Sequence, residues 1–549
     1  MYFKLLKIYF LYFFLCIIMM FKEKVVILRN NYSSKKNYND FKAFDKYLDE
    51  NKAFYKLKKS SNSKILVTDF VSTPGYVHTV GVIGRYLAKV IGSEIDGFIR
   101  EGDFRGRKIL ESFRSNKIFN LKQFSPLMTF SSFLNAARLF LKVNTIEDFT
   151  KIKLGKINIG LIVYDHILRH SGNGTFEKFN FKYLYYLTIA INVNKICKDI
   201  FKNKYKYAVI CELQFIPNAI IFENALVNKC KVVCHEGGMD KFSLRIFRSY
   251  EERFQHKIKY SNGIFEKLLK HKNNNLFKNR GNKLIKKKMK LNQSIQNDID
   301  TKKFKINRKI ICKNYNLNPN KPLVGIFAHD FVDGNFLNSG MLFRDKYSWF
   351  IKTLNFAKKY DNANWLIKDH PTDHTKKPKL LARAAYNDLC KNNKNIKFLS
   401  DEIKSKHLLT SIDLALTCTG SVGMESSCFG IKSVIASNTY YSGFGFINPV
   451  KNKKSYFREI ENILKEKNFK ISNQKIKKAN IYAYLLYGLG MNKCPIIPNF
   501  DQHRKRFNEQ QFWKDSVKLI KKYDFKNDMF LKKLSHQINK NQRHMLNYF

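Results

Sequence analysis

Residues 413–437, DLALTCTGSVGMESSCFGIKSVIAS, carry the pattern that decides the fold. The apolar run Asp413–Cys418 predicts a buried strand, and the small residues at 419–423 predict a tight turn. Met424–Phe429 then begins a helix, and residues 432–437 (KSVIAS) form a second apolar strand. A strand, a glycine turn, a helix and a strand make up the repeating unit of a parallel, doubly wound α/β sheet.

The same alternation of strands and helices extends along most of the 549 residues. A glycine-bearing loop with Gly75, Gly81 and Gly84 is expected to precede a helix at 85–92. Apolar runs predict further strands at 64–70, 157–165, 207–212, 231–238, 322–330, 363–371 and 395–400. We therefore expect an α/β protein with two Rossmann-like doubly wound domains that face a cleft, since such sheets bind ligands outside the carboxyl ends of their strands.

Composition shifts along the chain divide it into five expected segments. They are an apolar membrane-associating segment (1–24), an N-terminal Rossmann-like domain (25–256), a basic helical connector (257–315), a C-terminal Rossmann-like domain (316–475) and a C-terminal helical tail (476–549).

The overall composition excludes several classes of protein. Hydrophobic residues make up 44% and aromatic residues 15% of the chain, so it can bury large cores and is not disordered as a whole. The ten cysteines have no paired spacing, which favours a reducing compartment. The formal net charge of +56 allows an anionic partner. However, the excess is spread along the chain and is mostly lysine, so we expect no nucleic-acid partner.

Residues 8–21 (IYFLYFFLCIIMMF) form an unbroken apolar run with lysines on both sides. As a helix, 14 residues reach about 21 Å, which is short of a hydrocarbon core of about 30 Å. A short anchor or a helix lying in the plane of the membrane is the preferred interpretation, and a helix buried in the protein is the alternative.

The turn at 419–423 has the chemistry of a phosphate site. Gly420 and Gly423 permit close approach of the backbone, and Thr419 and Ser421 add hydroxyl groups. Amide N–H groups at the start of a helix attract anions, and Glu425 could accept hydrogen bonds from a ribose. The alternative is an ordinary turn capped by serine.

The segment WLIKDHP (365–371) ends a predicted strand, because Pro371 cannot continue the ladder. His370 is then left at the edge of the sheet, where it could protonate a departing phosphate oxygen, and Lys368 could supply a fixed positive charge. We predict no metal site here, since no helix carries ligands at metal spacing.

Other polar residues follow predicted strands and could serve as a base or hold an acceptor. Asp330 ends the strand at 322–330, and His235 and Glu236 end the strand at 231–238. Asp165 and Arg169 follow the strand predicted at 157–165. A carboxylate or imidazole in such a place could deprotonate an acceptor hydroxyl; capping or inter-strand hydrogen bonding is an equal alternative.

Together these motifs resemble bacterial capsule and surface-polysaccharide biosynthesis proteins of the glycosyltransferase-B type. The resemblance spans about residues 155–450, and its most specific parts are the His-Pro element and the Ser426-Ser427 pair. In related sialyl- and Kdo-transferases these elements contact the donor nucleotide, which implies that role for His370, Pro371, Ser426 and Ser427. Those enzymes have an acidic pair before glycine where this chain has His235-Glu236-Gly237, so the base is expected to be Glu236, with Asp330 second.

The resemblance implies a metal-independent glycosyltransferase without a cofactor, which transfers a sugar from a nucleotide-sugar donor to a growing capsular or surface polysaccharide. It also makes residues 25–256 the acceptor domain and residues 316–475 the nucleotide-sugar domain. The expected partners are a glycan or lipid-linked acceptor and an anionic membrane surface. The expected location is the cytoplasm, at the inner face of the plasma membrane. The alternatives are a polyol-phosphate transferase of the teichoic-acid type, a non-catalytic basic nucleic-acid-binding protein and a nucleotide-sugar epimerase.

Overall fold

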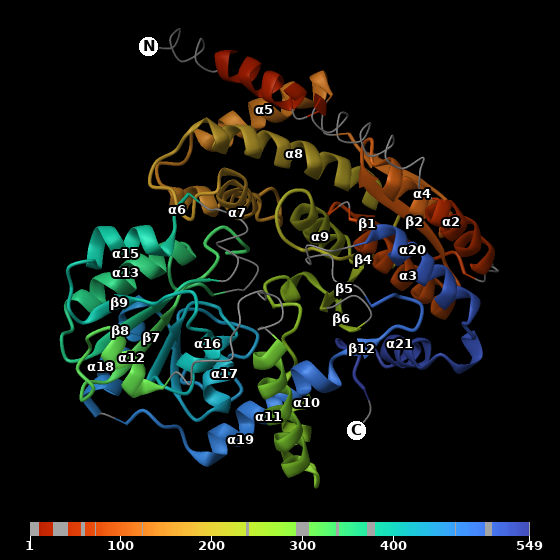
Figure 1. Cartoon of the computed structure of the whole chain (residues 1–549). Helices are drawn as coiled ribbons and strands as arrows, with labels where there is room; N and C mark the ends of the chain where they lie inside the picture. The colour runs from red at the N-terminus through yellow and green to blue at the C-terminus, as the bar shows by residue number, and fades with distance from the viewer. Residues whose placement is uncertain are drawn as a thin grey trace. The chain divides into compact units, whose positions relative to one another are not determined.

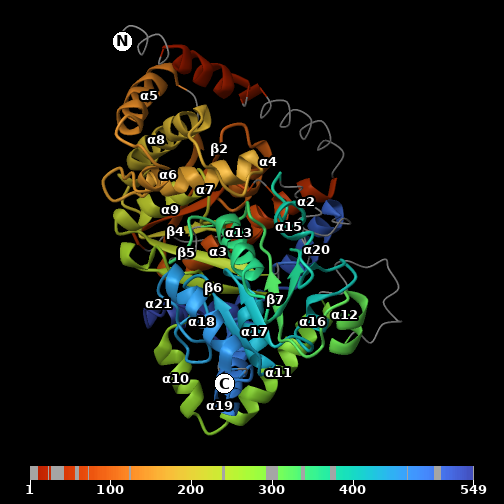
Figure 2. The same cartoon turned by 90° about the vertical axis from the view of Figure 1, so that its left-hand side faces the viewer.

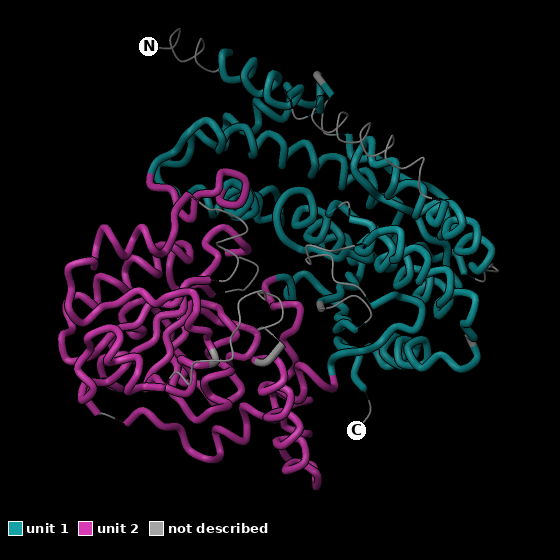
Figure 3. Tube along the Cα trace, in the orientation of Figure 1, with its two compact units in different colours: residues 1–167, 178–253, 490–549 teal, residues 168–177, 254–489 magenta. Residues whose placement is uncertain are grey.

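The computed structural model describes two compact units (Figure 3). Unit 1 comprises residues 1–167, 178–253 and 490–549, and unit 2 comprises residues 168–177 and 254–489. The described residues are 10–22, 24–25, 42–55, 61–71, 73–122, 125–237, 241–291, 307–335, 340–370, 379–466, 468–499 and 508–547. This division differs from the expected segments, because the basic connector belongs to unit 2 and the tail is shared between both units.

Unit 1 contains a seven-stranded sheet (Figure 1). Five parallel strands come in the order β3-β2-β1-β4-β5, and two antiparallel strands extend the β5 edge. Their bounds are β1 Lys64–Asp69, β2 Glu94–Arg100, β3 Ile118–Leu121, β4 Tyr207–Ile210, β5 Lys231–Gly237, β6 Lys241–Phe247 and β12 Asn492–Lys493. The strand order reverses direction between β1 and β4, which is the topological switch point of a Rossmann-like sheet.

Helices cover both faces of the unit 1 sheet. One core joins buried residues of β1, β2, β4, β5 and β6 to five helices, α2 (Lys42–Phe54), α3 (Pro74–Ile91), α4 (Phe104–Ser112), α20 (Glu509–Lys521) and α21 (Met529–Asn539). On the other side, α9 packs against β4 and β5, α8 packs against α9, and α5 packs against α8. The bounds of these three helices are α5 Pro126–Phe140, α8 Phe181–Phe201 and α9 Asn218–Val227. Two further helices between α5 and α8 are α6 Ile146–Thr150 and α7 Ile159–Ser171.

Two sequence predictions in unit 1 were wrong. The strand expected at 157–165 is the start of α7, which is buried on nearly every side. An apolar run of that kind cannot be distinguished from a buried strand by periodicity. The glycine loop expected before residue 85 is part of α3, which begins at Pro74. A Cβ atom on Gly81 would lie 2.3 Å from the Phe113 ring, so this glycine serves close helix packing.

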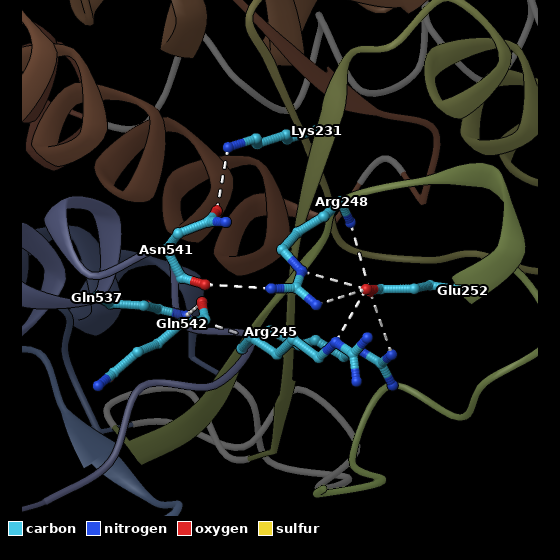
Figure 4. Close-up of polar contacts among 8 residues, drawn as sticks. Lys231, Arg245, Arg248, Glu252, Gln537, Asn541 and Gln542 are labelled. Atoms are coloured by element: carbon cyan, nitrogen blue, oxygen red, sulfur yellow. Dashed lines mark hydrogen bonds and ion pairs between the residues drawn. The ribbon is translucent and has the colours of Figure 1, made fainter.

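The C-terminal segment completes the sheet of unit 1. The amide of Ile246 donates to the carbonyl of Arg543, and the amide of Met545 donates to that of Leu244. Beside this junction, the side chains of Arg245, Arg248 and Arg543 converge on the buried carboxylate of Glu252 (Figure 4). Lys231 and Arg248 also bind Asn541, and Gln537 binds the carbonyl of Gln542. Residues 541–545 are therefore held by strand pairing and by ion pairs.

Unit 2 contains a five-stranded parallel sheet in the order β9-β8-β7-β10-β11, which is the order of the five parallel strands in unit 1. The strands are β7 Leu323–Phe327, β8 Asn364–Lys368, β9 Ile396–Phe398, β10 Leu414–Thr417 and β11 Lys432–Ile435. Each corresponds to a predicted strand. The chain is thus an α/β protein with two Rossmann-like units, as the sequence predicted.

Two helical layers enclose this second sheet. The core of one face includes α13 (Lys346–Lys358), α15 (Ala382–Cys390) and α18 (Lys453–Glu466), and that of the other includes α12 (Arg308–Asn314), α16 (Ser405–Leu408) and α17 (Val422–Cys428). The predicted basic connector forms α10 (Asn262–Lys270) and α11 (Asn274–Leu291), which pack with α19 (Asn473–Tyr484) (Figures 1 and 2). Because α19 also packs on α17, these helices support the glycine turn.

Residues 10–22 of the N-terminal apolar run are helical. Among the described residues, no helix has both the length and the apolar character needed to traverse a bilayer.

Candidate functional site

A group of polar residues lies at the carboxyl edge of the unit 2 sheet, around the switch point between β7 and β10. Lys368, Phe327 and Thr417 occupy the same register position on three neighbouring parallel strands. The chain segments that follow these strands therefore leave the sheet side by side. This arrangement brings together the His-Pro element after β8, the His329 segment after β7 and the glycine turn after β10.

His329 fixes the glycine turn from the centre of this edge. Its Nε2 atom accepts a hydrogen bond from the amide of Thr419 at 3.0 Å and lies 3.0 Å from the hydroxyl of Thr417. A backbone amide can only donate, so Nε2 is unprotonated and the neutral ring carries its proton on Nδ1. Burial, with the nearby charges of Lys346 and His370, holds the pKa of His329 well below its usual range. His329 is therefore a neutral positioning residue.

His370 is the more accessible imidazole of this edge. Its ring is half-buried and stacks parallel to that of His329, with 6.3 Å between the ring centroids. Lys368 is buried, and its ammonium group lies 3.9 Å from the carboxylate of Asp401. Burial lowers the pKa of Lys368, and the charges of Asp401 and Asp369 oppose that change. Pro371 lies outside the described residues.

The turn at 419–423 presents backbone donors next to these side chains. The amide of Gly420 donates to the hydroxyl of Thr417, and the carbonyl of Gly420 accepts from the hydroxyl of Tyr441. No described residue accepts a hydrogen bond from the amides of Ser421 and Val422, and the Ser421 side chain does not cap the helix. A Cβ atom on Gly420 would lie 2.7 Å from the Thr417 hydroxyl oxygen. Glycine is therefore needed for this turn, which leaves two amide donors for an anion.

The Ser-Ser pair and Glu425 lie inside unit 2. Ser426 and Ser427 are completely buried, and both hydroxyls donate to the carbonyl of Gly423 at 3.0 Å. The carboxylate of Glu425 accepts from the ammonium group of Lys288 on α11 at 2.9 Å. Burial lowers the pKa of Lys288, but Glu425, Tyr440 and Cys428 together oppose it, so that the net shift of the pKa is upward. In this structure the three residues expected to contact the donor instead anchor α17.

Unit 1 has acidic groups at the equivalent edge of its own sheet. Asp69 ends β1 and is 1% exposed, and its carboxylate accepts from the thiol of Cys211 after β4. Burial and the Asp69 charge raise the pKa of that thiol well above its usual value. Glu236 is half-buried near the end of β5, and the buried ring of His235 stacks on Tyr76 at 6.1 Å.

The remaining predicted residues fall into different surroundings. Asp165 lies buried on α7, so it is not at a strand end. Arg169, also on α7, belongs to unit 2 and pairs with Asp333 at 3.5 Å. Asp330 is buried after β7, and its carboxylate accepts from the amide of Val332. This last contact is the local capping arrangement that the sequence left as an alternative.

Sequence reasoning missed four polar residues of these two edges. Asp69 and Glu212 each stand at or just after the end of a predicted strand, and that position was a sufficient signal. Lys288 and Tyr441 reach their partners from segments far away in the sequence, so no local pattern could have found them. Among the described residues, no three His, Cys, Asp or Glu side chains are grouped to hold a metal ion.

Comparisons with known proteins gave fold-level likenesses alone. No family model matches the chain, and no curated protein matches it. Among solved structures, the KpsC beta Kdo 2,4 transferase of Thermosulfurimonas dismutans is similar, with 13% identity and a TM-score of 0.32 over 53% of this chain and 82% of that chain. A glycosyltransferase from Rickettsia africae has 12% identity and a TM-score of 0.25 over 85% of this chain and all of that one.

A third similar structure is the UDP-GlcNAc 2-epimerase of Neisseria meningitidis bound to UDP-GlcNAc. It has 12% identity and a TM-score of 0.25 over 76% of this chain and 94% of that chain. These similarities concern the fold alone.

Proposed function

We propose that the protein is a glycosyltransferase that moves a sugar from a nucleotide-sugar donor to a growing capsular or surface polysaccharide. The observation that carries this proposal is the arrangement at the carboxyl edge of the unit 2 sheet. There, the segment with His370 and the glycine turn leave the sheet on either side of the His329 segment, and the turn has two amide donors available. Backbone amides, an imidazole and the Lys368 ammonium group are the groups that bind a diphosphate or phosphate ester. The motif resemblance to capsule transferases supports the same assignment.

Each step of the transfer has a candidate group. The amides of Ser421 and Val422 bind the donor phosphate, and His370 donates a proton to the oxygen that leaves the anomeric carbon. Glu236 takes the proton of the acceptor hydroxyl as its oxygen bonds to that carbon. We favour Glu236 over Asp330 because Glu236 precedes Gly237, where the transferases that this chain resembles have an acidic pair before glycine. Lys368 and His370 supply positive charge to the departing phosphate, so we assign no step to a metal.

The acceptor we propose is a glycan, carried on a lipid at the inner face of the plasma membrane. Ser426 and Ser427 shape the phosphate turn through the Gly423 carbonyl, and we assign them no direct contact with the donor. Glu425 holds Lys288 and thereby fixes α17 against α11.

A thermal-stabilisation screen with CMP-, UDP- and GDP-sugars tests the donor site. One nucleotide class is expected to raise the melting temperature of the wild-type protein. Gly420→Val should abolish that shift, because its side chain would collide with Thr417 and His329. Gly263→Ala is the matched control, since a Cβ atom there meets no other group within 4 Å. Equal stabilisation of Gly420→Val and wild type would contradict the proposed site.

Product analysis then separates the transferase from its alternatives. Release of free nucleotide together with extension of a glycan acceptor supports the proposal. Inversion of one stereocentre of the sugar, while it stays attached to the nucleotide and without any acceptor, would identify an epimerase. Consumption of a nucleotide-linked polyol would identify a polyol-phosphate transferase. Either result would overturn the proposed reaction, although the phosphate-binding turn would remain in use.

A further inference from the structure

Exposed apolar side chains in unit 1 gather on two helices that contact one another. Helix 10–22 exposes Phe10, Leu11, Phe14, Leu15, Ile18 and Phe21. Helix α5 exposes Leu127, Phe130 and Leu134 at the three- and four-residue spacing of one helical stripe, and its C-cap residue Leu141 is exposed seven residues after Leu134. We call these ten side chains the apolar platform. Leu127 is 86% exposed and Phe10 is 65% exposed, values far above those of an ordinary surface leucine or phenylalanine that covers a core.

The two helices form one continuous surface. Phe13 packs its ring against Phe130 at 5.2 Å and Phe133 at 5.3 Å, and Met20 contacts Thr129. On the same inner side, Cys16 is fully buried and Tyr12 packs against Phe181 of α8. Helix 10–22 lies beside α5 (Figure 1). One side of helix 10–22 therefore packs on the protein, while its other side adds exposed apolar side chains to those of α5.

The charges on these helices indicate what the platform binds. Neither helix 10–22 nor α5 contains an acidic residue. The exposed basic residues Lys22 and Lys142 lie at or beyond the ends of the apolar stripes, and the exposed Arg138 lies between Leu134 and Leu141. Lys195 of α8 reaches the hydroxyl of Ser131 on the exposed side of α5. An apolar face with a basic border matches the interface of an anionic bilayer, where acyl chains meet negative headgroups.

We propose that the apolar platform docks the protein on an anionic membrane, with helix 10–22 and α5 lying in the plane of the interface. Thirteen helical residues reach only about 20 Å, so helix 10–22 enters one leaflet without crossing it. The sequence had indicated the N-terminal run alone; α5, more than 100 residues later, supplies the second half of the surface. This proposal does not depend on the transfer reaction.

Vesicle binding by the full-length chain tests the platform. Wild-type protein should co-sediment with phosphatidylcholine vesicles that contain phosphatidylglycerol, and less with phosphatidylcholine alone. The double variant Leu127→Glu with Leu134→Glu should lose at least about tenfold in vesicle affinity with an unchanged melting temperature. The control is Val227→Glu with Met529→Glu, which places the same charges on exposed apolar residues of unit 1 outside the platform. Equal losses in both double variants would overturn the proposal.

Fluorescence measures insertion directly. The three native tryptophans, Trp349, Trp365 and Trp513, are all buried, so Phe14→Trp provides a distinct reporter on the platform. Brominated acyl chains should quench it when vesicles are added. No quenching would contradict insertion. If Leu127→Glu with Leu134→Glu instead converted a dimer to a monomer and left vesicle binding unchanged, the platform would be an interface between two copies of the chain, and the membrane proposal would fail.

Discussion

Unit 1 and unit 2 share the order of their five parallel strands but carry opposite chemistry at the point where that order reverses. In unit 1 the strand ends bear the carboxylates of Asp69 and Glu236. In unit 2 they bear or lead into Lys368, His329 and His370, together with a turn rich in amide donors. The topology fixes where a ligand can bind, and the side chains placed there decide which ligand and which proton transfer are favoured.

The two units also differ in which parts of the chain complete their sheets. Unit 2 builds its five strands from one stretch between residues 323 and 435, whereas unit 1 needs the last sixty residues of the chain to close its β6 edge. Unit 1 therefore depends on contacts between residues about 300 positions apart, such as that between Glu252 and Arg543.

The largest expected effect is a loss of kcat when the acidic group of unit 1 or the imidazole of unit 2 is replaced. Glu236→Gln should lower kcat by about 10²–10⁴-fold while nucleotide-sugar affinity stays unchanged, because the proposed mechanism makes its carboxylate the base for the acceptor hydroxyl. His370→Ala should lower kcat to a similar extent and also weaken nucleotide binding, because the proposed mechanism places its imidazole on the donor phosphate. Steady-state kinetics with calorimetric titration of the donor would measure both.

A matched control for this pair is His536→Ala, which replaces a half-buried imidazole on α21, away from both sheet edges. It should leave kcat and donor affinity within the error of the wild-type values. If Glu236→Gln weakened donor binding and left kcat intact, the division of labour between the two units would be wrong.

The sequence predicted unit 2 more completely than unit 1, and the reason is physical. Each strand of unit 2 is a short apolar run that leads into a chemically distinctive turn, so His370 and Gly420 were placed correctly at one sheet edge. Helix α7 is buried on nearly every side, so no continuous polar face reveals its period. The glycines of α3 serve helix packing, although in sequence they resemble a phosphate loop.

One local and one long-range contact account for the rest. Ser427 was expected to contact a nucleotide from the resemblance to capsule transferases, and Glu425 from its place near the start of a helix. Their hydroxyl and carboxylate are instead engaged by Gly423 and by Lys288, which lies 137 positions before Glu425. Similarly, nothing in residues 541–545 by themselves indicates that they extend a sheet that begins at residue 64.

The next largest effect is a loss of stability when the C-terminal segment of unit 1 loses its ion pairs. Glu252→Gln should lower the free energy of unfolding by about 3 kcal/mol, since three arginines would lose their shared, nearly buried carboxylate. Glu111→Gln is the control, because its pair with Arg107 is exposed and should contribute less than about 0.5 kcal/mol. Urea denaturation of both variants gives the comparison. Equal, small losses would show that the ion pairs do not hold the C-terminal segment.

The smallest effect concerns a histidine that each unit buries in its neutral form. Burial lowers the pKa of His78 in unit 1 to about 3 and holds that of His329 in unit 2 well below its usual range. An unfolded chain binds a proton on each ring below about pH 6.5, and the folded units do not. The free energy of unfolding should therefore have its full value above that pH and fall by about 2 kcal/mol per histidine between pH 7 and pH 5.

Replacement by glutamine removes the titrating group and so distinguishes the two units. His329→Gln should flatten the pH dependence of unit 2 stability between pH 7 and pH 5, because the amide oxygen can still accept the Thr419 N–H but cannot gain a proton. His78→Gln should do the same for unit 1. The slope with pH is the readout, so a general loss of stability in either variant does not affect the comparison. An unchanged slope in His329→Gln would mean that the imidazole at the switch point is already charged, and it could not then accept the amide that shapes the phosphate turn.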